Sequence, residues 1–395
     1  MTGPLADLIV VDLSRAVAGP HAAMMLGDLG ARVIKVELPG SGDDTRRWGP
    51  PFVGPAESPE STYFLSANRN KQSIELDLKD PADLDTLRAM IRRADVLIEN
   101  FRPTVLDRLG FDAATLEALN PRLVVLSISG FGHDGPEGGR AGYDQIAQGE
   151  AGLMSLTGSG PHDRQRVGVP IADLLAGMNG AYGVLAALHE RESTGRGQIV
   201  RTSLLAALVG AHSFEGTRFT VAGEVGAARG NQHPSLAPYG LFSTADGVVQ
   251  VAVGNDALWR SFCTVVELDP DAPEFATNAD RVAHRDALVE AIEKAFAGRS
   301  SAELLAALDR AGVPSGTVRS IDEVYAWEQT RSQGLVVEVE HATLGVIEVP
   351  GPPLRFFGFD GAEQTRSIHT APPTLGQHAD AVREWLAEED RSQGD

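Results

Sequence analysis

The stretch LIVVDLSRAVAGPHAAMMLGDLGARVIKVE, residues 8–37, decides the fold class. Residues 8–13 are almost all apolar, which predicts a buried strand. A helix is expected between Pro20, which favours a helix start, and Gly30, which favours a helix end. Residues 32–37 are typical of a second strand. This strand–helix–strand order predicts a βαβ unit.

The same alternation continues over the first half of the chain. Further helices are expected at 81–93, at 113–119 and from Asp173 through Leu188, and further strands at 96–99, 123–128 and 198–202. Strands that alternate with helices of this length predict an α/β fold with a mostly parallel, doubly wound sheet.

The pattern changes after about residue 220. A linker rich in Gly and Ala is followed by a predicted hairpin at 241–253, with turn residues at Ala245-Asp-Gly247. Helices at 257–266, 280–297 and 302–311 and short strands at 335–340 and 345–350 follow. We therefore expect a large domain at 1–220, a linker and a small α+β domain at 221–325, and a return to the large domain with a polar tail at 326–395.

The charge balance restricts the partners. The formal net charge is -20, from 34 Lys and Arg against 54 Asp and Glu. A nucleic-acid or anionic-membrane surface needs a basic field, so both are excluded as expected partners. A few local Arg residues could still bind a phosphorylated small molecule.

The cysteine and histidine pattern predicts no metal site. Cys263 is the only cysteine, which rules out an intrachain disulfide, and the ten His residues are dispersed without metal-ligand spacing. The N-terminal residues lack the features of a signal peptide, and no unbroken apolar run reaches roughly the 18 residues of a membrane helix. A cytoplasmic location is expected.

One glycine motif is misleading. Residues 130–135, GFGHDG, match the GxGxxG pattern of dinucleotide sites and follow a predicted strand. Pro136, Gly138 and Gly139 come next, so the third glycine does not open a helix. The match also follows the fourth strand and not the first. A glycine-rich loop is therefore expected, and a nucleotide-dependent dehydrogenase is disfavoured.

Asp173 lies in VGVPIADLLAG, residues 167–177, where an apolar run meets a helix start. An Asp at a helix start commonly caps the first turn, and local sequence alone favours that role. A shielded carboxylate in the same place could also attack a thioester carbonyl and later leave from its own adduct.

An ordered set of segments covers nearly the whole chain. They are DLSRAVAGP (12–20), LGARVIKVE (29–37), GSGD (40–43), NRNKQSIELD (68–77), ENFRP (99–103), LDRLG (106–110), NP (120–121), SGFG (129–132), RAGYD (140–144), the Asp173 region, TGRGQ (194–198), NQHP (231–234) and APYG (237–240). The set resembles the family III CoA-transferases, the group of formyl-CoA transferase and the carnitine CoA-transferases, to which acyl-CoA racemases are related.

The resemblance implies a fold and a site. Each subunit would be an open ring with a Rossmann-like large domain, and two subunits would interlock as a homodimer. By motif position Asp173 is the nucleophile. The positions implied to face CoA are Val17, Ala18, Leu76, Asp77, Leu78, Lys79, Asn100, Phe101, Arg102, Arg108, Ala141, Gly142, Tyr143 and Asp144. CoA and its thioesters would be substrates, alongside a carboxylic acid, with no permanently bound cofactor.

Several of these residue types also fit structural roles. Arg102 and Arg108 suit the phosphates of CoA, although an isolated Arg is more often a solvated surface charge. Asn100 could cap a turn or hold the adenine, and Phe101 could be a core residue. Leu76 and Leu78 alternate along a strand and are as well explained by packing.

The chain departs from the family pattern at three places. Leu38 and Ala141 stand where some members carry a basic residue, and Gly254 is the only glycine where formyl-CoA transferase has a glycine run. These changes weaken any assignment of formyl or oxalate specificity.

Two activities within this group must be distinguished. The racemases use a His where this chain has Tyr143, and a Tyr with an ordinary pKa near ~10 is a poor base at neutral pH. His133 lies ten residues earlier, in the glycine loop. CoA transfer through aspartyl anhydride and aspartyl-CoA thioester intermediates is therefore expected, with a racemase as the alternative. A non-catalytic CoA-binding protein would tolerate loss of Asp173.

Overall fold

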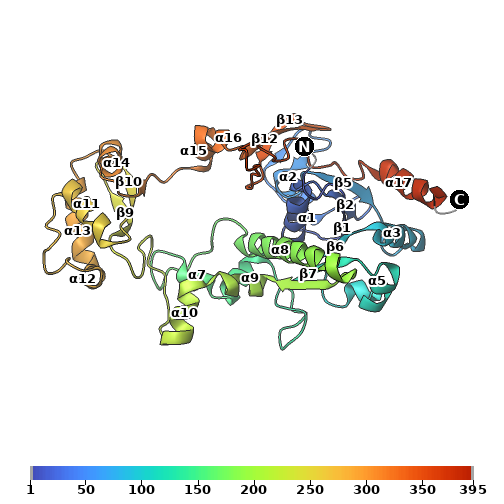
Figure 1. The fold of residues 1–395 in the computed structure, drawn as a ribbon, viewed down its shortest axis with the longest axis horizontal. Helices are drawn as coiled ribbons and strands as arrows, with labels where there is room; N and C mark the ends of the chain where they lie inside the picture. The colour runs from blue at the N-terminus through green and yellow to red at the C-terminus, as the bar shows by residue number, and fades with distance from the viewer. Residues whose placement is uncertain (1–2, 393–395) are drawn as a thin grey trace. The chain divides into compact units, whose positions relative to one another are not determined.

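The computed structural model describes residues 3–392 and divides into two compact units. The large unit contains the residues up to Leu153, Val167–Glu224 and the residues from Glu328 onward. The small unit contains Met154–Arg166 and Val225–Trp327. Figure 1 shows the elements of both units along the chain.

A six-stranded parallel sheet forms the centre of the large unit, in the order β5-β2-β1-β6-β7-β8. Its strands are β1 (Ile9–Asp12), β2 (Arg32–Glu37), β5 (Lys71–Glu75), β6 (Val96–Glu99), β7 (Val124–Ser129) and β8 (Ile199–Ser203). The predicted parallel sheet is confirmed.

Side-chain alternation along the strands explains the two layers of helices. In β1, Val10 packs into one core and Val11 into the other, and Val124 and Val125 of β7 divide in the same way. The first core is covered by α1 (Ala18–Asp28), α6 (Asp144–Glu150), α8 (Ile171–Thr194) and α9 (Leu204–Ala211). The second is covered by α3 (Pro81–Arg93), α4 (Val105–Arg108), α5 (Ala113–Leu119) and α17 (Ala379–Ser392).

Helix α8 packs against α1 and β7 (Figure 1). Small residues allow this close approach, because a Cβ atom at Gly180 would lie 2.8 Å from the Leu126 side chain. By length and composition α8 would also suit a membrane span, with mean hydropathy 1.4. Its buried Ala176 and Val184 instead belong to the first core of the large unit.

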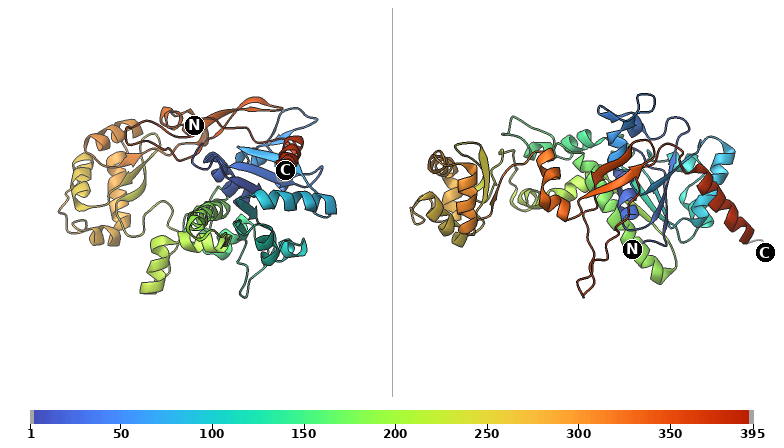
Figure 2. Two further views of the ribbon diagram at one scale, coloured as in Figure 1. Left: turned by 45° about the vertical axis from the view of Figure 1, so that its right-hand side comes forward. Right: turned by 90° about the horizontal axis from the view of Figure 1, so that it is seen from above.

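Shorter elements complete the large unit. They are the 3₁₀ turn η1 (Asp44–Arg47), β3 (Phe52–Val53), β4 (Glu60–Ser61), α2 (Thr62–Ser66), α10 (Ser213–Ala222), α16 (Glu328–Ser332), β12 (Val336–His341) and β13 (Gly345–Pro350). The two short strands predicted here are present as β12 and β13, orange in Figure 2, and they pair as an antiparallel hairpin. Strand β13 packs against α2. Helix α17 extends to Ser392, and the rest of the expected polar tail, 393–395, lies outside the described residues.

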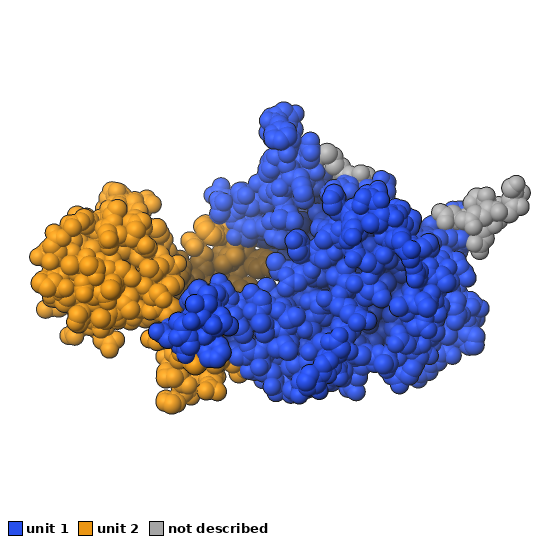
Figure 3. Space-filling model, turned by 60° about the horizontal axis from the view of Figure 1, so that its bottom comes forward, with its two compact units in different colours: residues 1–153, 167–224, 328–395 blue, residues 154–166, 225–327 orange. Residues whose placement is uncertain are grey.

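The small unit, orange in Figure 3, has a three-stranded sheet in the order β11-β10-β9. Its elements are α7 (Leu153–Leu156, which begins at the last residue of a large-unit segment), β9 (Tyr239–Ser243), β10 (Val248–Ala252), α11 (Asp256–Val266), α12 (Asn278–Ala283), α13 (Arg285–Phe296), α14 (Ser301–Arg310), β11 (Ser315–Gly316) and α15 (Ile321–Ala326). Backbone bonds from Ala228 to Ser155 and from Gly230 to Gly158, both 2.9 Å, attach the 154–166 segment to this unit.

Two sequence-based helix predictions need correction. The helix expected at 280–297 is two helices, because His284, with φ -105 and ψ 32, leaves the helical conformation between α12 and α13. Helix α1 begins at Ala18 and not after Pro20. Pro20 occupies the third helical position, where its missing N–H costs no intrahelical bond.

Candidate functional site

The loops that carry most of the expected site residues follow β1, β5, β6 and β7. Because these strands are parallel, their carboxyl ends meet at one edge of the sheet. The chain order reverses between β1 and β6, which are neighbours. Ligands of open α/β sheets commonly bind at such a switch point.

Asn100 joins the two loops at this switch point. Its Oδ1 accepts a bond from the Arg15 N–H at 2.9 Å, and its Nδ2 donates to the Arg15 carbonyl at 2.7 Å. The amide therefore pins the loop after β6 to the loop after β1.

A buried ion pair supports the loop after β1. Lys71 donates to the Asp12 carboxylate at 2.9 Å and to the Pro20 carbonyl at 2.8 Å. Burial alone would raise the pKa of Asp12, but the Lys71 and Lys35 ammonium groups hold it below its usual value. Burial lowers the pKa of Lys71 to about 8.

A second buried pair holds the start of the same loop. Lys35 donates to the Ser14 carbonyl at 2.8 Å and lies 2.9 Å from the Asp43 carboxylate. The Asp43 carboxylate in turn accepts a hydrogen bond from the N–H of Ala16 at 3.2 Å. Ala16 has a left-handed backbone conformation, with φ 65. The loop is thus held near both of its ends.

Val17 and Ala18 end this loop. Both are buried, at 5% and 3% exposure, and the Val17 carbonyl accepts the His21 N–H at 2.7 Å. Burial, reinforced by the nearby cations Arg69 and Lys71, lowers the pKa of His21 to about 4. His21 is therefore a neutral imidazole behind the loop.

Asp173 lies in the first turn of α8. The helix is preceded by Pro170, which supplies no side-chain cap, and the Asp173 carboxylate accepts no hydrogen bond from residues 3–388. The capping role favoured by local sequence is therefore wrong. Burial, and then the charge of Asp144, raise the pKa of Asp173 from 3.8 to about 7.

Tyr143 and Asp144 lie at the start of α6, beside this turn. The Asp144 carboxylate accepts the N–H of Ala172 at 2.8 Å. Tyr143 is 66% exposed, and its ring centroid is 6.5 Å from that of Trp48. Trp48 also meets the Tyr63 ring edge-on at 5.1 Å.

Sequence reasoning missed Trp48 and Tyr63. They are distant in sequence from RAGYD, and no spacing rule links them to it.

The loop 130–142 connects the end of β7 to Tyr143 and the start of α6. It contains no helix, as predicted for the glycine motif. A Cβ atom on Gly142 would lie 3.0 Å from the Phe131 ring, and Gly130 packs directly against Gly142. Ala141 is exposed next to this contact.

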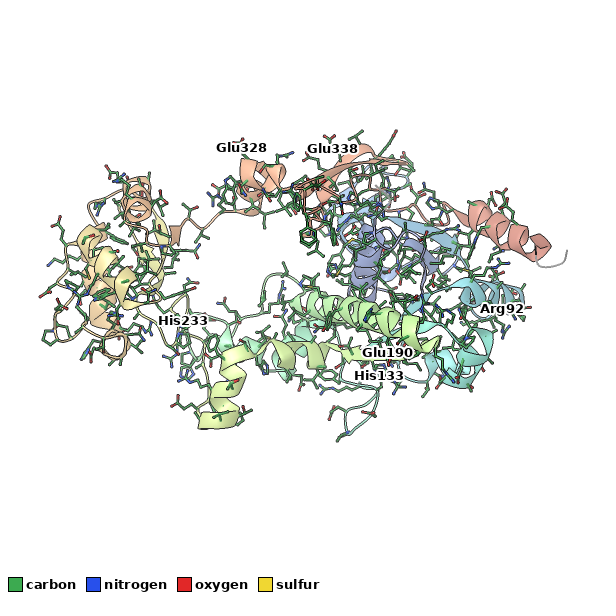
Figure 4. All side chains as sticks on the ribbon, viewed as in Figure 1. Arg92, His133, Glu190, His233, Glu328 and Glu338 are labelled. Carbon is green, nitrogen blue, oxygen red and sulfur yellow. The ribbon has the colours of Figure 1, made fainter. Side chains whose placement is uncertain are left out.

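His133 belongs to the same loop and is labelled in Figure 4. Its Nε2 lies 2.7 Å from the Ser127 hydroxyl, and its Nδ1 lies 3.4 Å from that of Ser129. The Ser127 hydroxyl also donates to Glu99. Both ring nitrogens of His133 are thus hydrogen-bonded to serine hydroxyls of β7.

The residues after β5 divide between core and turn. Leu76 is 1% exposed and Leu78 packs against the same core, which fits the packing alternative. Asp77 accepts the N–H of Lys79 at 3.0 Å and so shapes the turn, while the Lys79 side chain is exposed.

The residues after β6 present two exposed cations. Arg102 makes no ion pair within the described part of the chain, and Arg108 bonds only to the Thr104 carbonyl, at 3.3 Å. Phe101 is half-buried, with the Arg15 guanidinium 5.6 Å from its ring centroid. Among the side chains of residues 3–388, no group of three or more acidic, His or Cys residues could hold a metal ion.

Comparison with known proteins agrees with this arrangement. Residues 5–379 match the model of CoA-transferase family III. The chain is 38% identical over 395 residues to the succinyl-CoA:glutarate CoA-transferase of Homo sapiens, covering 99% of this chain and 88% of that protein. It is 38% identical over 389 residues to the acetyl-CoA:oxalate CoA-transferase of Acetobacter aceti, covering 98% and 96%.

A solved structure supports the same assignment. The crystal structure of a CAIB/BAIF family protein from Brucella suis superposes with a TM-score of 0.85 at 36% identity, covering 98% of this chain and 100% of that one. This chain is a CoA-transferase and belongs to family III.

Proposed function

We propose that the enzyme moves CoA from an acyl-CoA thioester to a free carboxylic acid, with Asp173 as nucleophile. The observation that carries this proposal is the state of the Asp173 carboxylate. It is partly buried, accepts no hydrogen bond from the described residues and has its pKa raised to about 7. A desolvated, more basic carboxylate is a better nucleophile than a solvated one.

The first half-reaction has two steps. A carboxylate oxygen of Asp173 attacks the thioester carbonyl, and the C–S bond breaks. CoA departs as its thiolate, and the acyl group stays on Asp173 as a mixed anhydride. The thiolate then attacks the Asp173 acyl carbon and expels the donor acid, which leaves an aspartyl-CoA thioester.

The second half-reaction repeats these steps in reverse order. The acceptor carboxylate attacks the aspartyl-CoA thioester and releases the thiolate, which gives a second mixed anhydride. The thiolate attacks the acceptor's acyl carbon and frees Asp173. No proton, metal or nucleotide is consumed, because the energy of the thioester is conserved.

The substrates are proposed from the relatives and from two residues. The relatives compared above are named for succinyl- and acetyl-CoA donors and for glutarate and oxalate acceptors. We infer a short dicarboxylic acid as acceptor. Glutarate is favoured over oxalate as the proposed acceptor, since Leu38 and Ala141 stand where some family members carry a basic residue.

CoA is proposed to lie over the loops after β1, β5 and β6. The exposed Lys79, Arg102 and Arg108 supply charge for its phosphates. Val17 and Ala18 are proposed to line the pantetheine path, and the 141–144 segment to border the thioester. Leu76 and Phe101 are proposed to support this surface from the core side.

Intact-protein mass spectrometry tests the nucleophile. Wild type is incubated with succinyl-CoA, with and without borohydride, beside Asp173→Ala and Asp173→Asn. A CoA-sized adduct, or reduction of the Asp173 side chain, is expected in wild type only. Absence of any adduct together with α-proton exchange in deuterated water would point to a racemase, and full turnover by Asp173→Ala to a CoA-binding protein without this chemistry.

Self-association is proposed from an exposed apolar face. Met178, Tyr182 and Leu185 lie on one side of α8 and are 47%, 75% and 37% exposed, while Phe214 and Phe219 of α10 are more than half exposed. Apolar side chains grouped in this way commonly mark an interface. We propose that a second copy covers them, in the interlocked dimer that the family resemblance implies.

Light scattering coupled to size exclusion tests this dimer. Wild type is expected at twice the chain mass, and Tyr182→Glu with Phe219→Glu at the mass of one chain. A wild-type monomer would contradict the proposal. The cytoplasm is proposed as the compartment, because a single cysteine allows no intrachain disulfide.

A further inference from the structure

Gln148 connects the two segments that flank the Asp173 turn. It lies in α6 with no exposed surface. Its Nε2 donates to the Asp144 carboxylate at 2.7 Å, and its Oε1 accepts the N–H of Val167 at 2.8 Å. One buried amide thus holds a helix on one side and the chain that leads into α8 on the other.

The first turn of α8 depends on this arrangement. Its own N-cap residue, Pro170, has no side-chain acceptor, and the N–H of Ala172 bonds instead to Asp144 of α6. Asp144 and Gln148 are separated by four residues, so both project from one face of that helix. The carboxylate that caps α8 is therefore itself held by Gln148.

We propose that Gln148 is a positioning residue for CoA transfer. It fixes Asp144 beneath the first turn of α8 and fixes the 167–169 segment that enters this turn, so that Asp173 meets the thioester carbonyl in one orientation. The inference rests on the proposed role of Asp173 as nucleophile and adds a residue outside the motifs that carry the family resemblance.

The chemistry of the two contacts restricts the residue type. One contact needs a donor toward Asp144, and the other needs an acceptor for the Val167 N–H. The Gln carboxamide offers both at neutral pH, whereas an ionised Glu accepts without donating. Asn has the same groups on a shorter side chain and would not span the same gap.

The same arrangement connects to the ionisation of Asp173. Asp144 contributes, after burial, to the raised pKa of Asp173. A residue that holds Asp144 in place also holds this repulsion constant. Loss of Gln148 should therefore change the pH dependence of the rate as well as its maximum, which a purely structural role would not do.

The test compares Gln148→Ala and Gln148→Glu with Gln145→Ala. Gln145 is an exposed residue of the same helix and is the matched control. With succinyl-CoA and glutarate, Gln148→Ala should lower kcat by roughly tenfold to a hundredfold, the cost of a misplaced reacting group, with little change in KM. The acid limb of its pH–rate profile should shift. Gln145→Ala should behave as wild type.

Gln148→Glu keeps the side-chain volume and decides the matter if Gln148→Ala does not fold. Its ionised carboxylate cannot donate to Asp144, so its relative rate should be lowest at high pH. The rate should recover toward wild type as the pH falls and the carboxyl regains its proton. A wild-type kcat and pH profile in folded Gln148→Glu would overturn the proposal.

Trapping separates this inference from the proposed function. If wild type forms no Asp173 adduct, the nucleophile assignment fails first, and Gln148 has no such step to position. If wild type forms the adduct and the Gln148 variants form it at the same rate, only the positioning role of Gln148 is lost.

Discussion

Gly177 of α8 lies directly against the carbonyl oxygen of Ala18. A Cβ atom added at Gly177 would stand 2.6 Å from that oxygen and 3.2 Å from the His21 ring. Position 177 is one helical turn beyond Asp173, and Ala18 ends the loop proposed to face CoA. The close crossing of α8 and α1 therefore sets the spacing between this loop and Asp173, the proposed nucleophile.

Gly177→Ala should separate the two helices. Overpacking at such a contact typically costs about 1–3 kcal/mol, which exceeds the gain of roughly 1 kcal/mol in helix propensity. The free energy of unfolding in urea and the transfer rate should both fall. In α9 a Cβ at Gly210 would meet no described atom within 4 Å apart from its chain neighbours and its own helix backbone, so Gly210→Ala should preserve or slightly raise stability. Equal effects of the two changes would contradict this account.

Asp173→Asn should raise stability at neutral pH while it abolishes transfer. The pKa of Asp173 is raised from 3.8 to about 7, so between these values the folded chain holds a proton that the unfolded chain has released. The unfolding free energy of wild type therefore falls as pH rises through this window. At about 1.4 kcal/mol per pKa unit the difference reaches at most roughly 4 kcal/mol, reduced by the partial exposure of the side chain.

Urea denaturation at pH 4 and pH 8 measures this difference. The Asn variant should gain relative to wild type only at the higher pH. A stability difference that is the same at both values would show that the Asp173 carboxylate is not destabilised by its surroundings.

Asp144→Asn should move the acid limb of the pH–rate profile to lower pH. Burial keeps the pKa of Asp173 raised, but the contribution from the charge of Asp144 is removed. The Asn oxygen can still accept the Ala172 N–H, so the fold should persist. Asp85→Asn, a change at a 76% exposed carboxylate of α3, is the control. An unmoved limb in Asp144→Asn would mean that the limb does not report Asp173.

Asp12→Asn should be strongly destabilising. It leaves Lys71 as an uncompensated charge in a site where both side chains of the pair have 0% exposure. Removing one partner of a buried pair typically costs about 3–5 kcal/mol. The loss should shrink as the pH rises through 8, because burial lowers the pKa of Lys71 in the wild-type pair to about 8 and the pair is lost once the ammonium has released its proton.

The exposed pair of Glu117 and Arg196 provides the comparison. Their side chains are 58% and 70% exposed, so Glu117→Gln should change stability by less than about 1 kcal/mol. Chemical denaturation of the two variants at pH 7 and pH 9 gives both quantities. A similar small loss in both would mean that the Asp12–Lys71 pair is not desolvated.

Arg102→Gln should raise KM for the acyl-CoA with little change in kcat. A hydrogen bond to a charged phosphate contributes about 1.5–3 kcal/mol, which corresponds to roughly tenfold or more in KM. The effect should be absent with a dephospho-CoA thioester if Arg102 binds the 3′-phosphate. Arg92, at the exposed end of α3, provides the control substitution Arg92→Gln. A uniform loss with both thioesters would assign Arg102 to another part of CoA.

Much of the fold could be predicted because its signals are local. The apolar runs of β1, β6 and β7 are buried on both faces, so each is recognisable without its neighbours. The predicted hairpin was confirmed as β9 and β10, and it could be predicted because Asp246-Gly247 is a typical turn sequence between the strands. The break at His284 was missed, since no Gly or Pro marks it and the helical pattern continues through it.

The candidate site was only partly predictable. Asp173 could be proposed from its motif, but its local sequence favoured a cap. Nothing in the spacing showed that the Asn100 amide would form hydrogen bonds with the backbone of Arg15, or that Trp48 would lie against Tyr143. Gln148 could have been suspected only from its separation of four residues from Asp144 on a short helix.

The sequence by itself determined the parallel α/β architecture, the family and the identity of the candidate nucleophile. These depend on periodicity and on residue types in a fixed order, which a chain carries before it folds. Only the tertiary structure decided that Asp144 and not Pro170 caps α8, and that the Asp173 carboxylate accepts no hydrogen bond from the part of the chain that the structure describes. The physical reason is that burial and charge act through space, between α6 and α8, and no local pattern records that distance.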